Sequence, residues 1–289
     1  MKKLLLYLLL LPALAFGQID KKKAWYLLSA PSSSIDSDYQ AVLDRATALG
    51  YTLPSAGQQV KQNQLILDLK SAGIWSQLDL FYVFATDGDQ NFSFINWKSP
   101  STFLLTKSGT VNFTANQGNI SNGTNGYLNT GWVPSTNAVN LTLNSTHVAV
   151  YVYNHVSENK YDLGTAPSFV NSTPQIYLRS DDSFGNFYHA LNQNGNSTVL
   201  NGGSAVAFWM PQRKDASNTY IFKNGVQVDV EVDASTAIPS GNLFLLAVNN
   251  GGAASNYTTR RLSMFSIGAS LTGLESAYYT AWNTYFTSL

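Results

Sequence analysis

The feature that most constrains the fold of this chain is a long succession of short, strand-like runs between Leu78 and Ile267. Each run is rich in apolar and aromatic residues, and clusters of Gly, Asn, Ser and Pro separate neighbouring runs. The runs lie at 78–85, 102–106, 110–114, 127–132, 147–153, 175–179, 187–191, 205–210, 219–223, 226–232, 243–248 and 261–267. Many short strands with turn signals between them are typical of an antiparallel sandwich or barrel, so the chain is predicted to be mainly β.

Two turns between these runs carry specific signals. Asn224-Gly225 separates the runs 219–223 and 226–232, and Asn-Gly favours the positive φ angles of a type I′ hairpin turn. The stretch 249–252, Asn-Asn-Gly-Gly, ends the run 243–248 in a second turn.

Helical patterns flank the β region on both sides. Ser37 with Gln40 and Ser55 with Gln58 have capping-box spacing, and apolar residues follow each pair at helical intervals. We therefore expect a helical hairpin over 35–77. Near the carboxyl end, a capping box at Thr272 and Glu275 precedes an amphipathic helix that is expected to pack on the sandwich.

The first residues have the pattern of a signal peptide. Lys2 and Lys3 precede the apolar run 4–15, and small residues at Ala15 and Gly17 allow cleavage before Gln18. A retained membrane anchor is the alternative. The predicted layout is a signal peptide at 1–17, a linker at 18–34, the helical hairpin at 35–77, and a jelly-roll sandwich with a terminal helix at 78–289.

Composition narrows the class of protein further. Charged residues make up only 12% of the chain, the formal net charge is zero, and no basic cluster occurs, which argues against nucleic acid as a partner. The chain has no cysteine, so disulfides and thiolate chemistry are excluded. We expect an exported protein that meets a membrane only through its leader.

Four segments in order resemble concanavalin-A-like and laminin-G-like domains. These segments are 121–131 (SNGTNGYLNTG), 148–153, 220–226 (YIFKNGV) and 261–268 with the helix that follows. They resemble the opening strand, the buried second strand, the asparagine-glycine hairpin and the closing strand of those domains. The resemblance implies an antiparallel jelly-roll sandwich over roughly 100–289.

A second resemblance lies upstream. The segments 38–42, 72–75, 84–89 and 96–98 look like those of bacteriophage tail or other virion proteins and their prophage relatives, in which a helical hairpin precedes the same sandwich. This likeness implies a tail, spike or other surface protein of a virion, or a bacterial surface component. Its implied partners are cell-surface glycans, neighbouring virion or surface proteins and further copies of the chain.

Three alternating carboxylates raise the possibility of catalysis. Asp229, Glu231 and Asp233 alternate with valines, which places the carboxylates on one face of a strand and the valines in the core. Jelly-roll glycosidases of the laminarinase type carry a further Glu on such a strand, but Thr236 stands in its place here. A solvated acidic face is the favoured interpretation, and a secreted polysaccharide hydrolase or lyase is the alternative.

Calcium is the one candidate cofactor. Asp87, Asp89 and Asn91 have the oxygen spacing of a calcium loop, although Phe92 and Lys98 exclude an EF-hand. Asp181-Asp182 is a second candidate, and ordinary Asx turns are the alternative for both stretches.

Aromatic residues make up 13% of the chain and indicate a possible glycan site. Trp97, Tyr127, Trp132 and Tyr188 lie near polar loops, where an exposed ring can pack on the apolar face of a sugar. With no complete catalytic motif, the sequence favours a non-enzymatic binding or adhesion protein that is exported to a virion surface, a bacterial surface or the extracellular space.

Overall fold

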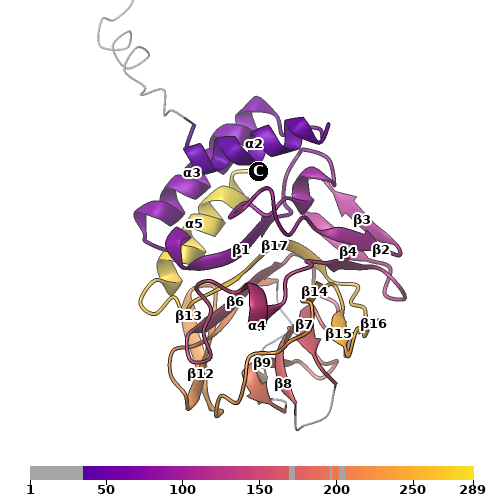
Figure 1. Ribbon diagram of the computed structural model, residues 1–289, viewed down its shortest axis with the longest axis vertical. Helices are drawn as coiled ribbons and strands as arrows, with labels where there is room; N and C mark the ends of the chain where they lie inside the picture. The colour runs from indigo at the N-terminus through magenta and orange to yellow at the C-terminus, as the bar shows by residue number, and fades with distance from the viewer. Residues whose placement is uncertain (1–34, 169–172, 196, 202–205) are drawn as a thin grey trace, which may run out of the picture. The chain divides into compact units, whose positions relative to one another are not determined.

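The computed structural model describes residues 35–168, 173–195, 197–201 and 206–289 (Figure 1). Ile35–Leu289 forms one compact unit, so the helical hairpin and the sandwich belong together. The predicted signal peptide and linker fall outside the described residues. None of the described helices is both long enough and apolar enough to cross a membrane.

One layer of the molecule is an antiparallel sheet, here called sheet A, with eight strands among the described residues. Its order is β13-β12-β11-β6-β17-β4-β3, and β1 also pairs with β17. The strands are β1 (Leu78–Val83), β3 (Val111–Thr114), β4 (Gly118–Ser121), β6 (Thr146–Val152), β11 (Ala207–Arg213), β12 (Asn218–Lys223), β13 (Val226–Val232) and β17 (Arg261–Gly268).

The second layer, sheet B, has nine described strands in the order β10-β9-β8-β7-β14-β5-β2, with β15 pairing β7 and β16. All its pairs are antiparallel except β15 with β7. The strands are β2 (Thr106–Ser108), β5 (Tyr127–Asn129), β7 (Leu163–Ala166), β8 (Pro174–Arg179), β9 (Asn186–Asn194), β10 (Ser197–Asn201), β14 (Phe244–Leu245), β15 (Val248–Asn250) and β16 (Ala253–Ser255).

The stretch 121–131 crosses from one sheet to the other rather than forming a single strand. It begins at the end of β4 in sheet A and continues into β5 in sheet B. Between them Asn122 Oδ1 accepts hydrogen bonds from the backbone N–H groups of Thr124, Asn125 and Gly126 at 3.1, 3.1 and 3.2 Å. This asparagine-centred turn replaces strand pairing where the chain changes layers.

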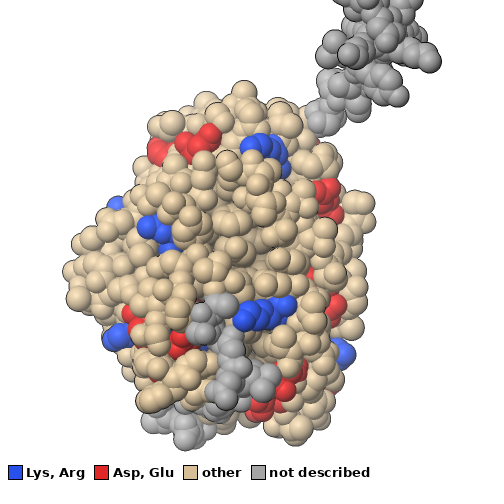
Figure 2. Space-filling model, turned by 180° about the vertical axis from the view of Figure 1, so that it is seen from behind, with Lys and Arg blue, Asp and Glu red and all other residues tan. Residues whose placement is uncertain are grey.

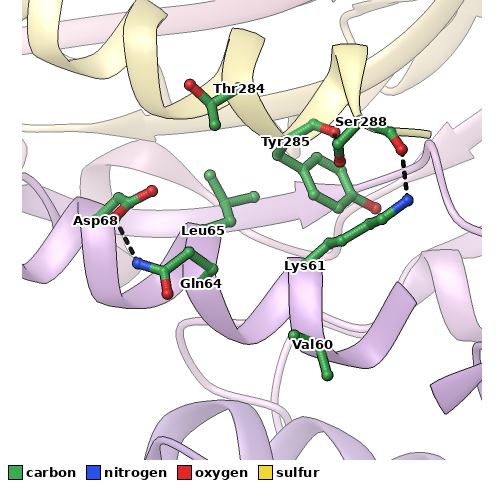
Figure 3. Close-up of a pocket in the computed structure, with 8 residues that line it drawn as sticks. All are labelled: Val60, Lys61, Gln64, Leu65, Asp68, Thr284, Tyr285 and Ser288. Atoms are coloured by element: carbon green, nitrogen blue, oxygen red, sulfur yellow. Dashed lines mark hydrogen bonds between the residues drawn. The ribbon is translucent and has the colours of Figure 1, made fainter. Parts of the chain in front are cut away.

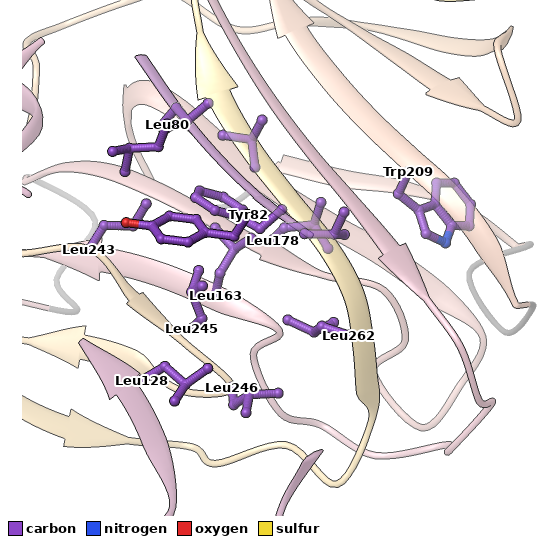
Figure 4. Close-up of a cluster of buried hydrophobic side chains, with 14 of the residues drawn as sticks. Leu80, Tyr82, Leu128, Leu163, Leu178, Trp209, Leu243, Leu245, Leu246 and Leu262 are labelled. Carbon is purple, nitrogen blue, oxygen red and sulfur yellow. The ribbon is translucent and has the colours of Figure 1, made fainter. Parts of the chain in front are cut away.

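The main core lies between the two sheets (Figure 4). Along β6 the valines at 148, 150 and 152 belong to this core, while Ala149 belongs to a second core on the other face of sheet A. Successive side chains of β6 therefore alternate between the two cores, one on each face of sheet A. Because both faces of β6 are covered, nearly the whole strand is buried.

Three helices form a third layer on the outer face of sheet A: α2 (Ser37–Ala48), α3 (Ala56–Ser71) and α5 (Glu275–Thr287) (Figure 1). Shorter elements are η1 (Trp75–Gln77), η2 (Phe92–Phe94) and α4 (Pro134–Asn137). Trp282 of α5 is fully buried and stacks at 5.5 Å on Phe286. The predicted helical hairpin and the predicted packing of the terminal helix are confirmed.

Local signals were more accurate for turns than for helix caps. Asn224 and Gly225 have φ values of 52° and 76° and connect β12 to β13, as predicted. Ser55 caps α3 by accepting from Gln58 N at 3.3 Å. The other two capping boxes are wrong, because Asp36 rather than Ser37 caps α2, and α5 follows Leu274 without a side-chain cap.

Candidate functional site

The outer face of sheet B presents the best-developed polar site of the described residues. Among the described residues, the three long helices all pack on sheet A. On sheet B, Phe244 of β14 lies directly beside Asn129 of β5 and Gly164 of β7. Tyr127 lies two residues from Asn129, so its side chain belongs to the same face.

A pocket of about 560 Å³ opens at this point of the face. Its lining combines an aromatic pair with small and amide side chains: Tyr127, Asn129, Ala166, Pro167, Ser240, Gly241, Asn242, Phe244, Asn249, Gly251 and Gly252. The ring centroids of Tyr127 and Phe244 are 4.6 Å apart, with their planes tilted by 34°. The pocket therefore has one aromatic wall and several neutral hydrogen-bonding groups.

Backbone contacts hold the loops around the pocket in place. Asn249 Nδ2 donates to the Asn242 carbonyl at 2.8 Å, and Asn249 Oδ1 accepts from Gly252 N at 2.8 Å. Gly251, with φ of 60°, donates its N–H to the Ala166 carbonyl at 2.9 Å. A Cβ at Gly241 would approach Thr165 Oγ1 to 2.5 Å, so this backbone lies directly on the sheet. The pocket is consequently pre-formed by the fold.

The chemistry of this lining suits a neutral, hydroxyl-rich ligand. An aromatic ring covers an apolar patch, while Asn and Ser supply both donors and acceptors. Among the described lining residues the only titratable side chain is the Tyr127 phenol. The described lining thus offers an aromatic face and neutral donors and acceptors to a ligand.

The four aromatic residues predicted to bind glycan fall into two groups. Tyr127 is half-buried at the pocket, and Tyr188 is half-buried on the same face of sheet B. Trp97 and Trp132 are 0% and 1% exposed, which corrects the prediction for both. Trp97 packs beneath the helices against Phe81 at 5.8 Å, whereas Trp132 belongs to the core between the sheets.

The partners of Tyr127 were not predicted. Asn129, Asn242 and Asn249 come from three separate stretches of the chain that meet only in the folded sheet. The signal available in the sequence was the Asn-Asn-Gly-Gly turn at 249–252, which was interpreted as a turn alone. It is also one wall of the pocket.

The proposed calcium loop connects the helical hairpin to the sandwich. Asp87 Oδ1 accepts from Ser55 N at 2.9 Å, and Asp89 accepts from Thr52 N at 2.9 Å and from Phe92 N at 2.7 Å. Asn91 is exposed. The carboxylates therefore cap the backbone of the α2–α3 turn and of η2, and calcium at this loop stays a prediction.

A metal site elsewhere in the chain would need a group of side chains that could hold the ion. Among the described residues, no group of three or more His, Asp or Glu side chains is arranged to hold a metal ion. Asp181 and Asp182 accept backbone N–H groups from Ser183 and Phe184, each at 2.8 Å, in ordinary Asx turns.

The acidic strand β13 is oriented opposite to the prediction. Its valines are exposed, by 66, 39, 40 and 85% at 226, 228, 230 and 232, rather than buried in the core. Asp229 lies beside the core residue Ile221, so the carboxylates face the space between the sheets. The strand is at the edge of sheet A, and alternation alone cannot tell which of its faces is covered.

These carboxylates do not complete the laminarinase-type pattern. Burial, followed by the charges of Asp229 and Asp233, raises the pKa of Glu231 above its ordinary value. Thr236, at the position of the further glutamate, instead donates through Oγ1 to Asn194 Oδ1 at 2.9 Å. The strand therefore carries an acid with a raised pKa but not the further glutamate of the laminarinase-type pattern.

A second, smaller pocket of about 270 Å³ lies between α3 and α5 (Figure 3). Lys61 Nζ donates to the Ser288 carbonyl, and Gln64 Nε2 donates to Asp68 Oδ1 at 2.8 Å. The Tyr285 hydroxyl is turned inward, toward the Ala85 carbonyl at 2.5 Å. Since its polar groups already bind one another, this pocket is a weaker candidate than the one on sheet B.

Charge does not mark a functional surface on the side shown in Figure 2. Lys, Arg, Asp and Glu of the described residues are scattered among neutral side chains there. That face therefore offers no extended basic surface to a polyanion.

Several solved structures align with parts of this chain. A mutant of Trypanosoma rangeli sialidase that displays trans-sialidase activity aligns with 80% of this chain and 40% of its own, with a TM-score of 0.52 and 8% identity. Domain 4 of AbnA, a GH43 extracellular arabinanase from Geobacillus stearothermophilus, in complex with arabinotriose, aligns with 70% of this chain and 98% of its own, with a TM-score of 0.45 and 12% identity. The Ruminococcus gnavus IT-sialidase CBM40 bound to α2,3-sialyllactose aligns with 45% and 77%, with a TM-score of 0.34 and 12% identity.

The sequence itself has no match among protein-family models or curated proteins. At 8% identity the likeness to the sialidase concerns the fold, and this chain spans less than half of that protein. Together with the two described sheets, it shows a mainly antiparallel jelly-roll sandwich that carries an N-terminal helical hairpin and a C-terminal helix.

Proposed function

We propose that this chain is a non-enzymatic glycan-binding module that binds sugar in the pocket on the outer face of sheet B. The observation that carries the proposal is the pocket itself, where the Tyr127–Phe244 pair adjoins the side chains of Asn129, Asn242 and Asn249. Aromatic packing on a sugar face, with amide groups beside it for hydroxyls, needs no charge and no catalytic pair.

The test is binding of the purified chain to an array of oligosaccharides. Tyr127→Ala is expected to weaken binding about tenfold or more, because it removes the aromatic wall. Tyr279→Ala, a half-exposed tyrosine on α5, is the matched control and is expected to bind as the wild type does. Unchanged binding by Tyr127→Ala, or no binding by the wild type, would refute the proposal.

The alternative is a polysaccharide hydrolase or lyase that uses Asp229 and Glu231 between the sheets. The raised pKa of Glu231 is the observation in its favour, because a general acid must keep its proton near neutral pH. Release of reducing ends or unsaturated products by the wild type, abolished in Glu231→Gln, would establish this alternative.

The biological setting of the module is also part of the proposal. We place it on a virion or bacterial surface, reached by export, on the strength of the sequence resemblance to tail and prophage proteins. Mass spectrometry of purified virions and of culture supernatant distinguishes these locations from a free secreted protein.

A further inference from the structure

A second feature of the outer face of sheet B is an arginine held between tyrosines. Arg179 of β8 lies directly opposite Tyr188 of β9. Its guanidinium carbon is 3.8 Å from the centroid of the Tyr188 ring and 5.4 Å from that of Tyr161. The flat guanidinium therefore stacks on aromatic faces that fix its position.

This guanidinium has no carboxylate partner among the described residues. Arg179 is 8% exposed, its Nε has no hydrogen-bond partner, and Nη1 donates to the side chain of Asn159. No described carboxylate lies within the 4.0 Å of an ion pair with it. Outside the described residues the sequence contains one carboxylate side chain, Asp20.

The two other deeply buried arginines, Arg213 and Arg260, have hydrogen-bond acceptors for their Nε donors. Arg260 Nε donates to Asp162 Oδ1 at 2.6 Å. Arg213 donates through Nε to the Leu191 carbonyl at 2.8 Å, through Nη1 to the Asp233 carbonyl at 2.6 Å, and through Nη2 to Gln193 Oε1 at 2.7 Å. Arg179 is the exception among the three, with a donor left over.

Two acids that follow Arg179 in the sequence, Asp181 and Asp182, bind other groups or lie beside them. Asp182 accepts from Phe184 N at 2.8 Å and from the backbone and side chain of Asn186, each at 3.0 Å, and the Tyr188 phenol also hydrogen-bonds it. Asp181 Oδ1 accepts from Ser183 N at 2.8 Å, whereas Asp181 Oδ2 has no hydrogen-bond partner and lies 3.7 Å from His155 Nδ1. Neither carboxylate forms an ion pair with Arg179.

A buried cation without a counter-ion is costly, and the guanidinium fork matches a carboxylate. We propose that Arg179 is an anion-binding subsite that receives the carboxylate of an acidic sugar. The Tyr188 ring, 3.8 Å from the guanidinium carbon, fixes the plane of the fork, and the 8% of Arg179 that is exposed is the part open to a carboxylate.

The position of Arg179 connects this subsite to the pocket. Phe244, Gly164 and Tyr177 are side-by-side neighbours on β14, β7 and β8, and Arg179 lies two residues beyond Tyr177 on the same face. Two strand spacings across the sheet, roughly 10 Å, and two residues along β8, roughly 7 Å, separate Phe244 from Arg179. A short oligosaccharide is long enough to occupy both the pocket and the Arg179 subsite. This inference rests on the proposed function.

The first experiment tests the subsite without any sugar. Thermal unfolding is followed in sodium acetate, with sodium chloride of equal ionic strength as reference. Saturable binding should raise the midpoint of the wild type by about 2–4 °C at a tenfold excess over Kd, and Arg179→Gln should not respond. Lys61→Gln, which removes an equal charge on α3, should respond as the wild type does.

A wild type that does not respond to acetate, or an Arg179→Gln variant that responds fully, overturns the proposal. Should Arg179→Gln fail to fold, the wild-type Arg179 Nε–H resonance is followed by NMR during the acetate titration. A saturable shift supports the subsite, and an unmoved resonance refutes it.

The second experiment compares matched acidic oligosaccharides with their carboxyl-reduced, neutral counterparts. The wild type should bind the acidic member about tenfold more tightly, Arg179→Gln should lose that preference, and Tyr127→Ala should weaken both. Equal binding of both members overturns the subsite and leaves the pocket standing. Acetate binding without any sugar binding instead supports the subsite and refutes the proposed function.

Discussion

The two outer faces of the sandwich differ in what covers them. On sheet A, three helices bury a second apolar core that includes Trp97, Phe208 and Trp282. On sheet B, the same pleated geometry presents an aromatic and amide pocket and the tyrosine-flanked Arg179. A covered face contributes stability, whereas an accessible face can contribute recognition, so the two should respond differently to substitution.

The largest expected effect is on the covered face. Trp282→Ala should lower the free energy of unfolding by about 3–5 kcal/mol, because it leaves a cavity between α5 and sheet A. Tyr127→Ala, on the other face, should cost about 1 kcal/mol. Chemical denaturation measures both, and comparable losses for the two variants would contradict the contrast.

Acid should destabilise the covered face through His147. His147 Nδ1 donates to the Ala269 carbonyl at 2.5 Å and its Nε2 hydrogen-bonds Ser266 Oγ at 3.1 Å, and burial lowers the pKa of this histidine from 6.5 to about 4. The unfolded chain then binds the proton more readily than the folded one. Stability should fall by about 3 kcal/mol as the pH drops from 6.5 toward 4.

The control for this pH effect is His147→Gln, which cannot titrate. The difference in unfolding free energy between the wild type and this variant should shrink as the pH falls through that window. If the two proteins lose stability in parallel, His147 is not a source of the acid sensitivity.

A smaller effect is expected where the hairpin joins the sandwich. Asp89→Ala should cost about 1–3 kcal/mol, since it leaves the N–H groups of Thr52 and Phe92 without their acceptor. Asp44→Ala, an exposed acid on α2, serves as the control. Chelation tests the calcium prediction: a calcium-dependent midpoint that Asp89→Ala abolishes would reveal a metal site, and an unchanged midpoint would leave the capping role alone.

The smallest effect should come from the exposed valines of β13. Val230→Thr should change the free energy of unfolding by no more than about 0.5 kcal/mol, because the side chain is 40% exposed on an edge strand. Val150→Thr, buried between the sheets, should cost about 1–3 kcal/mol. A large loss for Val230→Thr would mean that this edge is covered.

Much of the fold could be predicted from local patterns. The Asn224-Gly225 turn, the helices of the hairpin and most strands follow from short-range signals, because turn chemistry and side-chain period act within a few residues. The alternation of apolar and polar residues along a strand does not show which of its two faces another layer covers. The valines of β13 and those of β6 have the same pattern, but only the β6 valines meet a second sheet.

The candidate site was harder to predict, for a related reason. Tyr127 and Trp97 both adjoin polar loops in the sequence, yet one ring lines a pocket and the other turns into the core. The pocket brings together β5, the 240–242 loop and the 249–252 turn, which are distant along the chain. Arg179 is visible as a lone cation at the end of an apolar run, but its missing counter-ion is a property of the fold.

The most direct test of the account is to map the bound sugar on the protein by amide chemical-shift changes in NMR. Titration with the best oligosaccharide from the array should perturb β5, β14 and β15 around Tyr127, Phe244 and Asn249. The groove between α3 and α5 and the β13 edge should remain unperturbed. Shifts centred on either of those regions, with the sheet B pocket unchanged, would contradict the assignment of recognition to the face that lies away from the helices.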